Sequence, residues 1–287
     1  MTVCHPAPLY PLTYEPIVLR ALEEDLGRAG DLTSDAVLPP GLEATAKIVA
    51  RSAGRIAGLP VAVSAFRLLD PSLEIDCQAA DGEDVEAGSS LATIRGAARS
   101  ILSAERTALN LLGRLCGIAT VTRDLVAQVA PHGAQVVDTR KTTPGLRVLE
   151  KHAVRCGGGQ NHRFGLDDAV LIKDNHIALA GGIRPAVERA RQRVGHMVKI
   201  ELEVDSLDQL REALDLGVDV VLLDNMLPET LREAVRMARG KAVTEASGGI
   251  TPKTAAAIAA TGVDLLSVGW LTHSAPALDV ALDVAES

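Results

Sequence analysis

The sequence predicts an α/β protein made of two parts, a unit of mixed strands and helices followed by a parallel α/β barrel. Three observations predict this fold. Short strand patterns separated by glycine turns run from Ala44 to Arg95, and a long helical pattern runs from Ala98 to Val129. From residue 134 onward, apolar strands alternate with amphipathic helices, which is typical of parallel strands joined by right-handed crossovers.

The first part is expected to begin irregularly, because residues 1–15 are rich in proline. Pro16 can open a helix at its first position, and Gly27 would end it. The elements expected next are a capped or turn-rich loop at Gly30–Gly41, a strand, glycine turn and second strand at Ala44–Gly58, a helix at Leu59–Leu69 entered through Pro60, a strand at Leu73–Ala79 and two edge segments within Asp81–Gly96.

The long helix from Ala98 to Val129 is expected to break near Gly117 and to contain the domain boundary. Arg106, Asn110, Gly113 and Gly117 lie on one strip of this helix. Because that strip is polar and small, another stretch of backbone could approach it closely.

The barrel is predicted from six apolar runs: AQVVDTR, DAVLIKD, VKIELEV, VDVVLLDN, KAVTEAS and VDLLSVG. They are continuous rather than alternating, as in strands that are buried on both faces. Closed into a barrel, their carboxyl ends meet at one mouth, where barrel enzymes place their chemistry. An open doubly wound sheet is the alternative, but no GxGxxG motif follows the first strand. The residues at these ends lie 21 to 35 positions apart: Asp138 with Arg140 and Lys141, then Lys173, Glu203, Asp224, Ser247 and Gly269.

The charge distribution favours a small anionic ligand over a polyanionic partner. The chain has 29 Lys and Arg against 37 Asp and Glu, a net charge of −8, yet the window from Val137 to His176 carries +2. The net acidity and an aromatic content of 2% argue against nucleic-acid binding. The four cysteines form no CxxC pair, and we find no signal-peptide pattern or membrane-spanning run, so we expect a cytoplasmic protein.

Cations at the predicted mouth are the first site candidates. Several of them together suit a ligand with more than one carboxylate or phosphate, and they are Arg140, Lys141, Arg163 and Lys173. The alternative is that they form solvated salt bridges with Asp138, Asp167 and Asp174. His162 follows the glycines Gly157–Gly159, which permit a close approach to a ligand or a sharp turn. The alternative for His162 is a structural hydrogen bond.

Glu203 and Asp224 end adjacent strands, and in a basic mouth they suggest a shared Mg²⁺ that also contacts substrate phosphates. Glu201 lies on the same strand face as Glu203 and could support it. The alternatives are a strand-end cap or a salt bridge to Lys173. Glycines after the last two strands could hold a phosphate through backbone N–H groups, in the segments Ser247-Gly248-Gly249 and Val268-Gly269-Trp270. His273 could add a donor or cap a helix.

The motifs DTRKT, GGGQNHR, LIKDNH, ELEV, LLDN and SGG, in this order and spacing, resemble those of quinolinate phosphoribosyltransferases, also called carboxylating nicotinate-nucleotide pyrophosphorylases. AERTALNLL and GDLTS match the N-terminal part of that family. The resemblance implies an N-terminal α/β sandwich over residues 1–116, to which a tail of residues 275–287 returns, and an incomplete α/β barrel over residues 117–274. It also implies a homodimer, the substrates quinolinate and phosphoribosyl pyrophosphate, and a Mg²⁺ requirement.

The resemblance implies a role for each matching residue. Quinolinate carboxylates would be held by Arg140, His162, Arg163 and Lys173. Phosphoribosyl pyrophosphate and its metal would be held by Lys141, Glu203 and Asp224, and Thr139 is a further candidate for substrate binding. The 5′-phosphate would lie against Ser247, Gly248, Gly249 and Gly269. Arg106 would reach across the dimer interface into the partner's barrel.

Two other functions compete with this interpretation. A related molybdenum-transport-associated paralogue has a similar fold, but it tends to lose the Asn-His-Arg and Lys-Asp-Asn-His motifs that stand here at Asn161–Arg163 and Lys173–His176. A non-catalytic barrel that binds an anion and regulates would need the cations. It would have no use for Glu203 and Asp224, which weaken anion binding without a metal.

Overall fold

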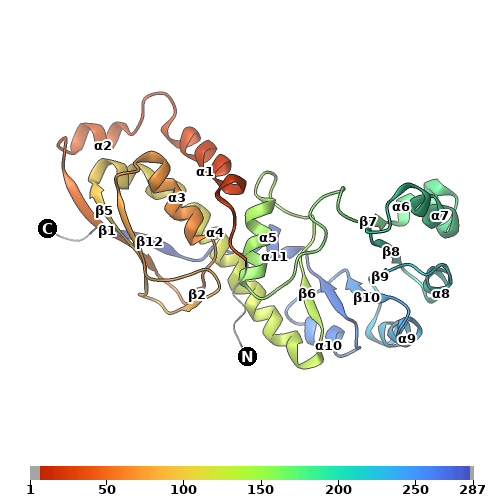
Figure 1. Cartoon of the computed structure of the whole chain (residues 1–287). Helices are drawn as coiled ribbons and strands as arrows, with labels where there is room; N and C mark the ends of the chain where they lie inside the picture. Colours follow the sequence, from red (N-terminus) through yellow and green to blue (C-terminus); the bar gives the residue numbers. More distant parts are fainter. Residues whose placement is uncertain (1–6, 285–287) are drawn as a thin grey trace. The chain divides into compact units, whose positions relative to one another are not determined.

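The computed structural model describes residues 7–284 of the chain, which form two compact units (Figure 1). Unit 1 contains the described residues within Met1–Arg123, Thr142–Gly158 and Leu271–Ser287, and unit 2 contains Asp124–Lys141 and Gly159–Trp270. Helix α4 (Ala98–Val129) carries the chain from unit 1 into unit 2. The division expected at residues 116 and 117 remains a prediction.

Unit 1 is built on a four-stranded antiparallel sheet in the order β12-β1-β5-β3. The prediction that β5 lies at an edge is wrong, because it pairs with β1 on one side and β3 on the other and buries its apolar residues. A separate antiparallel pair is formed by β2 and β4. The strands are β1 (Glu43–Ala50), β2 (Gly54–Arg55), β3 (Glu74–Cys77), β4 (Asp84–Val85), β5 (Ser90–Ala97) and β12 (Val280–Val284).

Helix α1 (Pro11–Leu26) begins five residues before the predicted start at Pro16. Pro11 takes the first turn, where a missing N–H has no helical partner to lose. Pro16 lies inside the helix and removes one backbone hydrogen bond, but Tyr14, Val18 and Leu22 are still buried on one side. Burial of that stripe against the core of unit 1, including α3 (Leu59–Leu69), outweighs the proline.

The predicted loop at Gly30–Gly41 contains a short helix, α2 (Leu32–Val37), whose first N–H groups donate to the Asp31 carboxylate. Helix α4 is continuous, so the expected break near Gly117 is wrong. The small strip does admit a second backbone, which belongs to the chain's own C-terminal segment. A Cβ on Gly117 would lie 2.0 Å from the Pro276 carbonyl oxygen, and Leu278 N–H donates to the Gly113 carbonyl at 2.8 Å.

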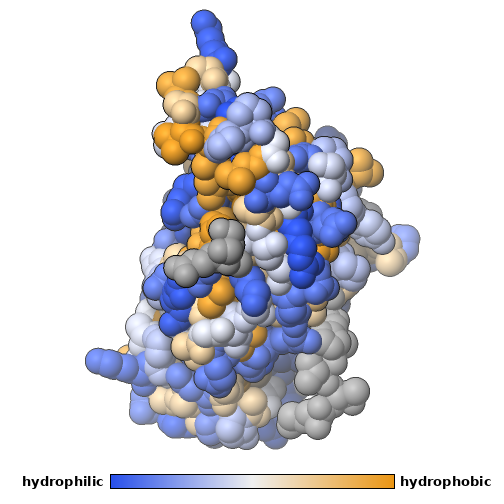
Figure 2. All heavy atoms as spheres, turned by 90° about the vertical axis from the view of Figure 1, so that its left-hand side faces the viewer, coloured by the Kyte–Doolittle hydropathy of each residue, from blue (hydrophilic) through white to orange (hydrophobic). Residues whose placement is uncertain are grey.

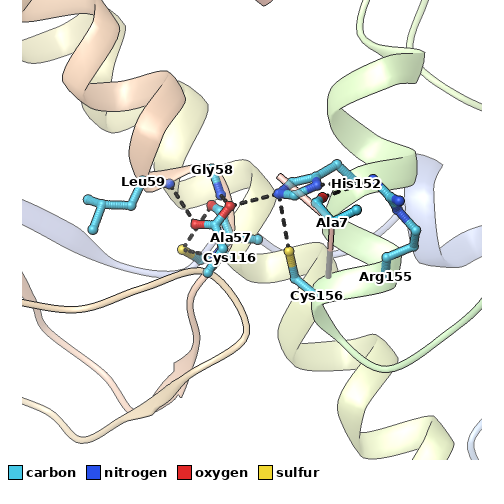
Figure 3. Close-up of polar contacts among 9 residues, drawn as sticks. Ala7, Ala57, Gly58, Leu59, Cys116, His152, Arg155 and Cys156 are labelled. Atoms are coloured by element: carbon cyan, nitrogen blue, oxygen red, sulfur yellow. Dashed lines mark hydrogen bonds and ion pairs between the residues drawn. The ribbon is translucent and has the colours of Figure 1, made fainter. Parts of the chain in front are cut away.

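A buried polar network joins α5 (Arg147–Cys156) to the start of α3 (Figure 3). Both oxygens of Asp81 accept N–H groups at the beginning of α3, from Gly58 and Leu59 at 3.0 Å each. Asp81 Oδ2 also lies 2.7 Å from His152 Nε2, while the Arg155 guanidinium lies 3.4 Å from His152 Nδ1. Since arginine can only donate, Nδ1 accepts and Nε2–H donates to Asp81.

Replacing Asp81 with alanine is expected to lower the free energy of unfolding by about 2–4 kcal/mol, because α3 loses its N-terminal acceptor and a buried histidine donor is left unpaired. The measurement is urea denaturation followed by circular dichroism. Glu86→Ala, at an exposed carboxylate in the same unit, is the matched control and should change the value by less than about 0.5 kcal/mol. Equal values for the two variants would contradict this role of Asp81.

Unit 2 is a six-stranded parallel sheet in the order β6-β11-β10-β9-β8-β7, with no direct pairing between β6 and β7 in the described chain. All six strands match the apolar runs in the sequence: β6 (Gln135–Val137), β7 (Val170–Ile172), β8 (Ile200–Val204), β9 (Val220–Asp224), β10 (Val243–Ser247) and β11 (Leu265–Ser267). Gln160 lies beside β6, where its N–H donates to the Val136 carbonyl at 2.8 Å.

Helices follow the strands of unit 2 as predicted, and α7, α8 and α9 pack in succession (Figure 1). Each paired strand of this sheet is parallel to its neighbour, so the carboxyl ends of the strands lie at the same edge of the sheet. The helices not yet given are α6 (Asp174–Ala180), α7 (Ile183–Arg193), α8 (Leu207–Leu216), α9 (Pro228–Ala238), α10 (Ala255–Ala259), α11 (Trp270–His273) and a 3₁₀ turn at Ala130–His132.

Exposed large apolar side chains are scattered, and several lie on α1 and α2, including Leu12, Leu19, Leu32 and Val37. In the face drawn in Figure 2, hydrophobic residues gather mainly in the upper part of the view, and hydrophilic residues cover most of the rest. Some exposed apolar surface is ordinary on a protein. Within residues 7–284, none of the helices combines the length and apolarity that crossing a bilayer requires.

Candidate active site

A cavity of about 310 Å³ lies at the carboxyl ends of the strands of unit 2. Seven of the predicted site residues line it: Thr139, Arg140, Lys141, His162, Arg163, Lys173 and Ser247. Four lining residues were not predicted: Leu171, Leu222, Glu245 and Ser267. The structure therefore brings the predicted cations together at one place, as the strand-end argument expected.

Among the described residues, no carboxylate lies in ion-pair contact with Arg140 or Arg163, whereas Lys173 is paired with Glu203. Arg140 Nε is buried without a hydrogen-bond partner, and Arg163 Nη1 donates to the Ala169 carbonyl at 3.1 Å. Burial, and then the charge of Arg140, lower the pKa of the Arg163 guanidinium. Two neighbouring guanidinium groups without a directly bound carboxylate make a site for an anion.

Lys173 is paired with an acid. Its Nζ lies 2.8 Å from Glu203 Oε2, across the adjacent strands β7 and β8, so the salt bridge considered for Glu203 is present. Asp224 ends β9 and accepts a hydrogen bond from Asn225 Nδ2 at 2.7 Å. Glu203 is registered with Leu222, two residues before Asp224, so both carboxylates lie on the same face of the sheet. These two oxygen donors suit a hard cation such as Mg²⁺.

His162 is held from two sides. Its Nδ1 accepts the Arg163 backbone N–H at 2.7 Å, and its Nε2 lies 2.9 Å from Glu201 Oε2. Asp138, fully buried, accepts the His162 backbone N–H at 2.9 Å and Asn161 Nδ2 at 2.7 Å. Asp138 therefore fixes the Asn-His-Arg segment at the cavity. In this geometry both ring nitrogens of His162 face protein groups, and its contact with a ligand remains a prediction.

Glu245 is the one charged residue among the four lining residues that the sequence analysis missed. Its side chain is 2% exposed, and its Oε1 lies 3.5 Å from His162 Nε2. Glu201 Oε1 and Glu245 Oε1 are both buried without a hydrogen-bond partner. The available signal was the alternation of β10, because Glu245 stands two residues before Ser247 and so points to the same face.

Glycines shape the site in two places. Gly248 has a φ of 88°, and a Cβ there would lie 2.1 Å from Asn225 Oδ1, so no other residue fits without movement of that side chain. Gly158, with a φ of 87°, makes the sharp turn that was expected after α5. Gly157 instead packs closely on α4, since its Cβ would lie 2.6 Å from the Ala119 carbonyl oxygen.

The remaining predicted residues do not line the cavity: Glu203, Asp224, Gly248, Gly249, Val268, Gly269 and Trp270. Val268 N–H donates to the Val137 carbonyl at 2.9 Å, and Trp270 Nε1 donates to the Ile250 carbonyl at 2.9 Å. Both contacts are structural. Arg106 and His273 belong to unit 1, where the Arg106 side chain is 66% exposed and His273 Nδ1 contacts Ser274 Oγ at 2.6 Å.

The sequence matches two family models in succession. The model of the quinolinate phosphoribosyl transferase N-terminal domain matches residues 31–116, and that of the C-terminal domain matches residues 118–283. The chain belongs to the quinolinate phosphoribosyltransferase family. The resemblance drawn from the motifs is thereby confirmed.

Relatives in this family are similar over nearly the whole chain. A probable carboxylating nicotinate-nucleotide pyrophosphorylase from Bacillus subtilis (strain 168) is 47% identical over 264 residues, 92% of this chain and 91% of the relative. A mitochondrial decarboxylating quinolinate phosphoribosyltransferase, 2b, from Nicotiana tabacum is 40% identical over 92% of this chain and 80% of the relative.

Solved structures of the family confirm the fold class, an N-terminal α/β sandwich with an incomplete parallel α/β barrel. The nicotinate-nucleotide pyrophosphorylase from Francisella tularensis superposes with a TM-score of 0.93 at 40% identity, over 97% of this chain and 98% of that one. NadC from Streptococcus pyogenes superposes with a TM-score of 0.93 at 38% identity, over 98% of this chain and 100% of that one.

Proposed function

We propose that this chain transfers the phosphoribosyl group of phosphoribosyl pyrophosphate to quinolinate with loss of CO₂. The products are nicotinate mononucleotide, CO₂ and pyrophosphate, in the biosynthesis of NAD. The observation that carries this proposal is the pair of guanidinium groups on the cavity wall, Arg140 and Arg163, neither of which forms an ion pair with a carboxylate of the described residues. Quinolinate bears two adjacent carboxylates, which such a pair can bind through parallel N–H···O bonds.

Orientation of the pyridine ring is the first contribution of these residues. Held by its carboxylates between Arg140, Arg163 and Lys173, quinolinate would present its ring nitrogen to C1 of the ribose. Fixing two reactants in this way replaces an encounter with an intramolecular step. Lys173 would exchange part of its contact with Glu203 for a carboxylate of the substrate.

Departure of pyrophosphate is the second requirement, because it leaves positive charge on the ribose and negative charge on the leaving group. Lys141 on the cavity wall would bind the departing anion, and the backbone of Ser247-Gly248-Gly249 would hold the 5′-phosphate. Mg²⁺, held by Glu203 and Asp224, would neutralise further charge on the pyrophosphate when bound.

A homodimer is part of this proposal, with Arg106 given to the barrel of the partner. Arg106 is 66% exposed, and its ion-pair partner in the structure is its neighbour Glu105, at 3.3 Å. A long exposed arginine on the surface of unit 1 is available for a substrate carboxylate in a second subunit. The cytoplasm, as expected from the sequence, is the proposed location.

The test is pyrophosphate release by the purified protein with phosphoribosyl pyrophosphate, Mg²⁺ and either quinolinate or nicotinate. We expect release with quinolinate only, matched by CO₂. Release with nicotinate instead would refute a pocket for the second carboxylate. A folded protein that releases pyrophosphate with neither would favour the molybdenum-associated paralogue or a regulatory barrel.

A further inference from the structure

Three titratable side chains meet in the wall of the cavity. His162 Nε2 lies 2.9 Å from Glu201 Oε2 and 3.5 Å from Glu245 Oε1. Their side chains are only 14%, 8% and 2% exposed, respectively. Two buried carboxyl groups therefore face the same ring nitrogen of His162, and that nitrogen can donate its one proton to only one of them.

The hydrogen bonds place the proton of the imidazole. Since the Arg163 backbone N–H donates to Nδ1, that nitrogen carries no proton and Nε2 carries it. Nε2–H donates to Glu201, the nearer carboxylate. Glu245 Oε1 receives no hydrogen bond in the structure, although the residue is almost fully buried.

A buried carboxyl beside another one favours its neutral form. Burial first, and then the negative charge of Glu201 on β8, raise the pKa of Glu245 to about 7. Asp138, after β6, raises that pKa further, whereas His162 and the nearby Ser267 hydroxyl of β11 lower it. Glu245 thus keeps its proton in acid solution and loses it as the pH rises through neutrality, while lining the cavity.

The proposed reaction needs a proton at this place. When the carboxylate leaves the ring carbon next to the nitrogen, the carbon–carbon bond breaks and its electron pair stays on the ring carbon. Among the cavity's described side chains, arginines cannot release a proton and the His162 proton is given to Glu201. In the proposed reaction the two lysines of the cavity have other tasks, because Lys141 binds pyrophosphate and Lys173 binds a carboxylate of the substrate.

We propose that Glu245 is the general acid of the decarboxylation and donates its proton to the ring carbon that loses CO₂. The bond from Glu245 to its proton breaks as the new carbon–hydrogen bond forms, and Glu245 is left as a carboxylate. Solvent protonates it again before the next turnover. This step rests on the proposed function. The overall reaction must place a proton on the ring carbon in place of the lost carboxylate, and Glu245 would supply that proton.

The test compares pyrophosphate and CO₂ release from quinolinate in a single turnover of Glu245→Gln, which keeps the shape and loses the proton. We expect pyrophosphate release within a few-fold of the unmodified protein and CO₂ release at least about a hundredfold slower. The nucleotide that still carries both carboxylates should accumulate. Glu245→Asp should recover part of the CO₂ release, and Glu86→Gln, at an exposed position in unit 1, should leave the ratio of the two products unchanged.

The pH dependence gives a second readout. The raised pKa of Glu245 keeps this carboxyl protonated below a pH of about 7. The ratio of CO₂ to pyrophosphate released by the unmodified protein should therefore fall as the pH rises through that value. In Glu245→Gln the ratio should be low at every pH. Infrared spectroscopy tests the protonation of Glu245 without any turnover. We expect the band of a protonated carboxyl at low pH in the unmodified protein, and we expect that band to be missing in Glu245→Gln.

Several results would overturn the proposal. Equal loss of both products, together with loss of quinolinate binding, would make Glu245 a structural residue. Full CO₂ release by Glu245→Gln would mean that the proton comes from elsewhere. Absence of the infrared band in the unmodified protein would mean that Glu245 is not protonated, and it could not then act as the acid. No pyrophosphate from the unmodified protein would instead refute the proposed function, and this step with it.

Discussion

Lys141→Ala is expected to lower turnover at least about a hundredfold while quinolinate binding stays nearly unchanged. Lys141 follows Arg140 in the loop after β6, and its backbone N–H donates to Thr139 Oγ1 at 3.0 Å. This turn places a lysine and an arginine on the same cavity wall, where they serve different anions in the proposed reaction. The lysine would act on the leaving pyrophosphate, whose additional negative charge develops in the transition state.

Steady-state pyrophosphate release and calorimetric titration with quinolinate measure these two effects separately. Lys241→Ala, at an exposed lysine in unit 2, is the matched control and should change neither. Lys141→Arg should retain part of the rate that Lys141→Ala loses, because it keeps the positive charge but replaces the ammonium with a planar guanidinium. A parallel loss of binding and turnover in Lys141→Ala would contradict the role assigned to this lysine.

The barrel could be predicted because its signals are local. Each of the six strands is a continuous apolar run, and each is followed by an amphipathic helix, so the order of the elements fixed the parallel topology. The carboxyl ends of those strands then gathered the basic residues without any knowledge of distances. Arg140, Arg163 and Lys173 were found in this way.

The misplaced elements depend on contacts between distant residues. Pro16 resembles a helix start locally, but the buried stripe of Tyr14, Val18 and Leu22 extends α1 to Pro11. β5 resembles an edge strand until β3 and β1 are seen to pair with both of its sides. The continuity of α4 depends on packing that a single Gly117 does not override.

The basic window from Val137 to His176 is divided between the two units, and the sequence does not show this division. Thr142–Gly158 belong to unit 1, where Glu150, fully buried, accepts hydrogen bonds from Arg114 and from the Thr143 backbone. An amphipathic helix does not reveal which unit it packs on. Glu245 was missed for a related reason, since an acid inside an apolar strand is recognised only when its neighbours are known.

Arg106→Ala should lower activity about a hundredfold by itself, since a charge-assisted contact with a substrate carboxylate would be lost. Lys173→Ala should also be inactive, because it removes a cation from the cavity wall. If Arg106 acts in the barrel of the partner, mixing the two variants gives hybrid dimers with one complete site. Random assortment then restores about a quarter of the original activity.

Subunit exchange is followed with differently tagged chains, and pyrophosphate release is measured on the same mixtures. Arg106→Ala mixed with Arg106→Ala carrying the second tag is the control, and it should gain nothing. The exposed position of Arg106 means that its loss should leave the free energy of unfolding almost unchanged, so an inactive variant would remain folded. Hybrids that demonstrably form and stay inactive would argue that each barrel uses only its own residues, and Arg106 would then need another role.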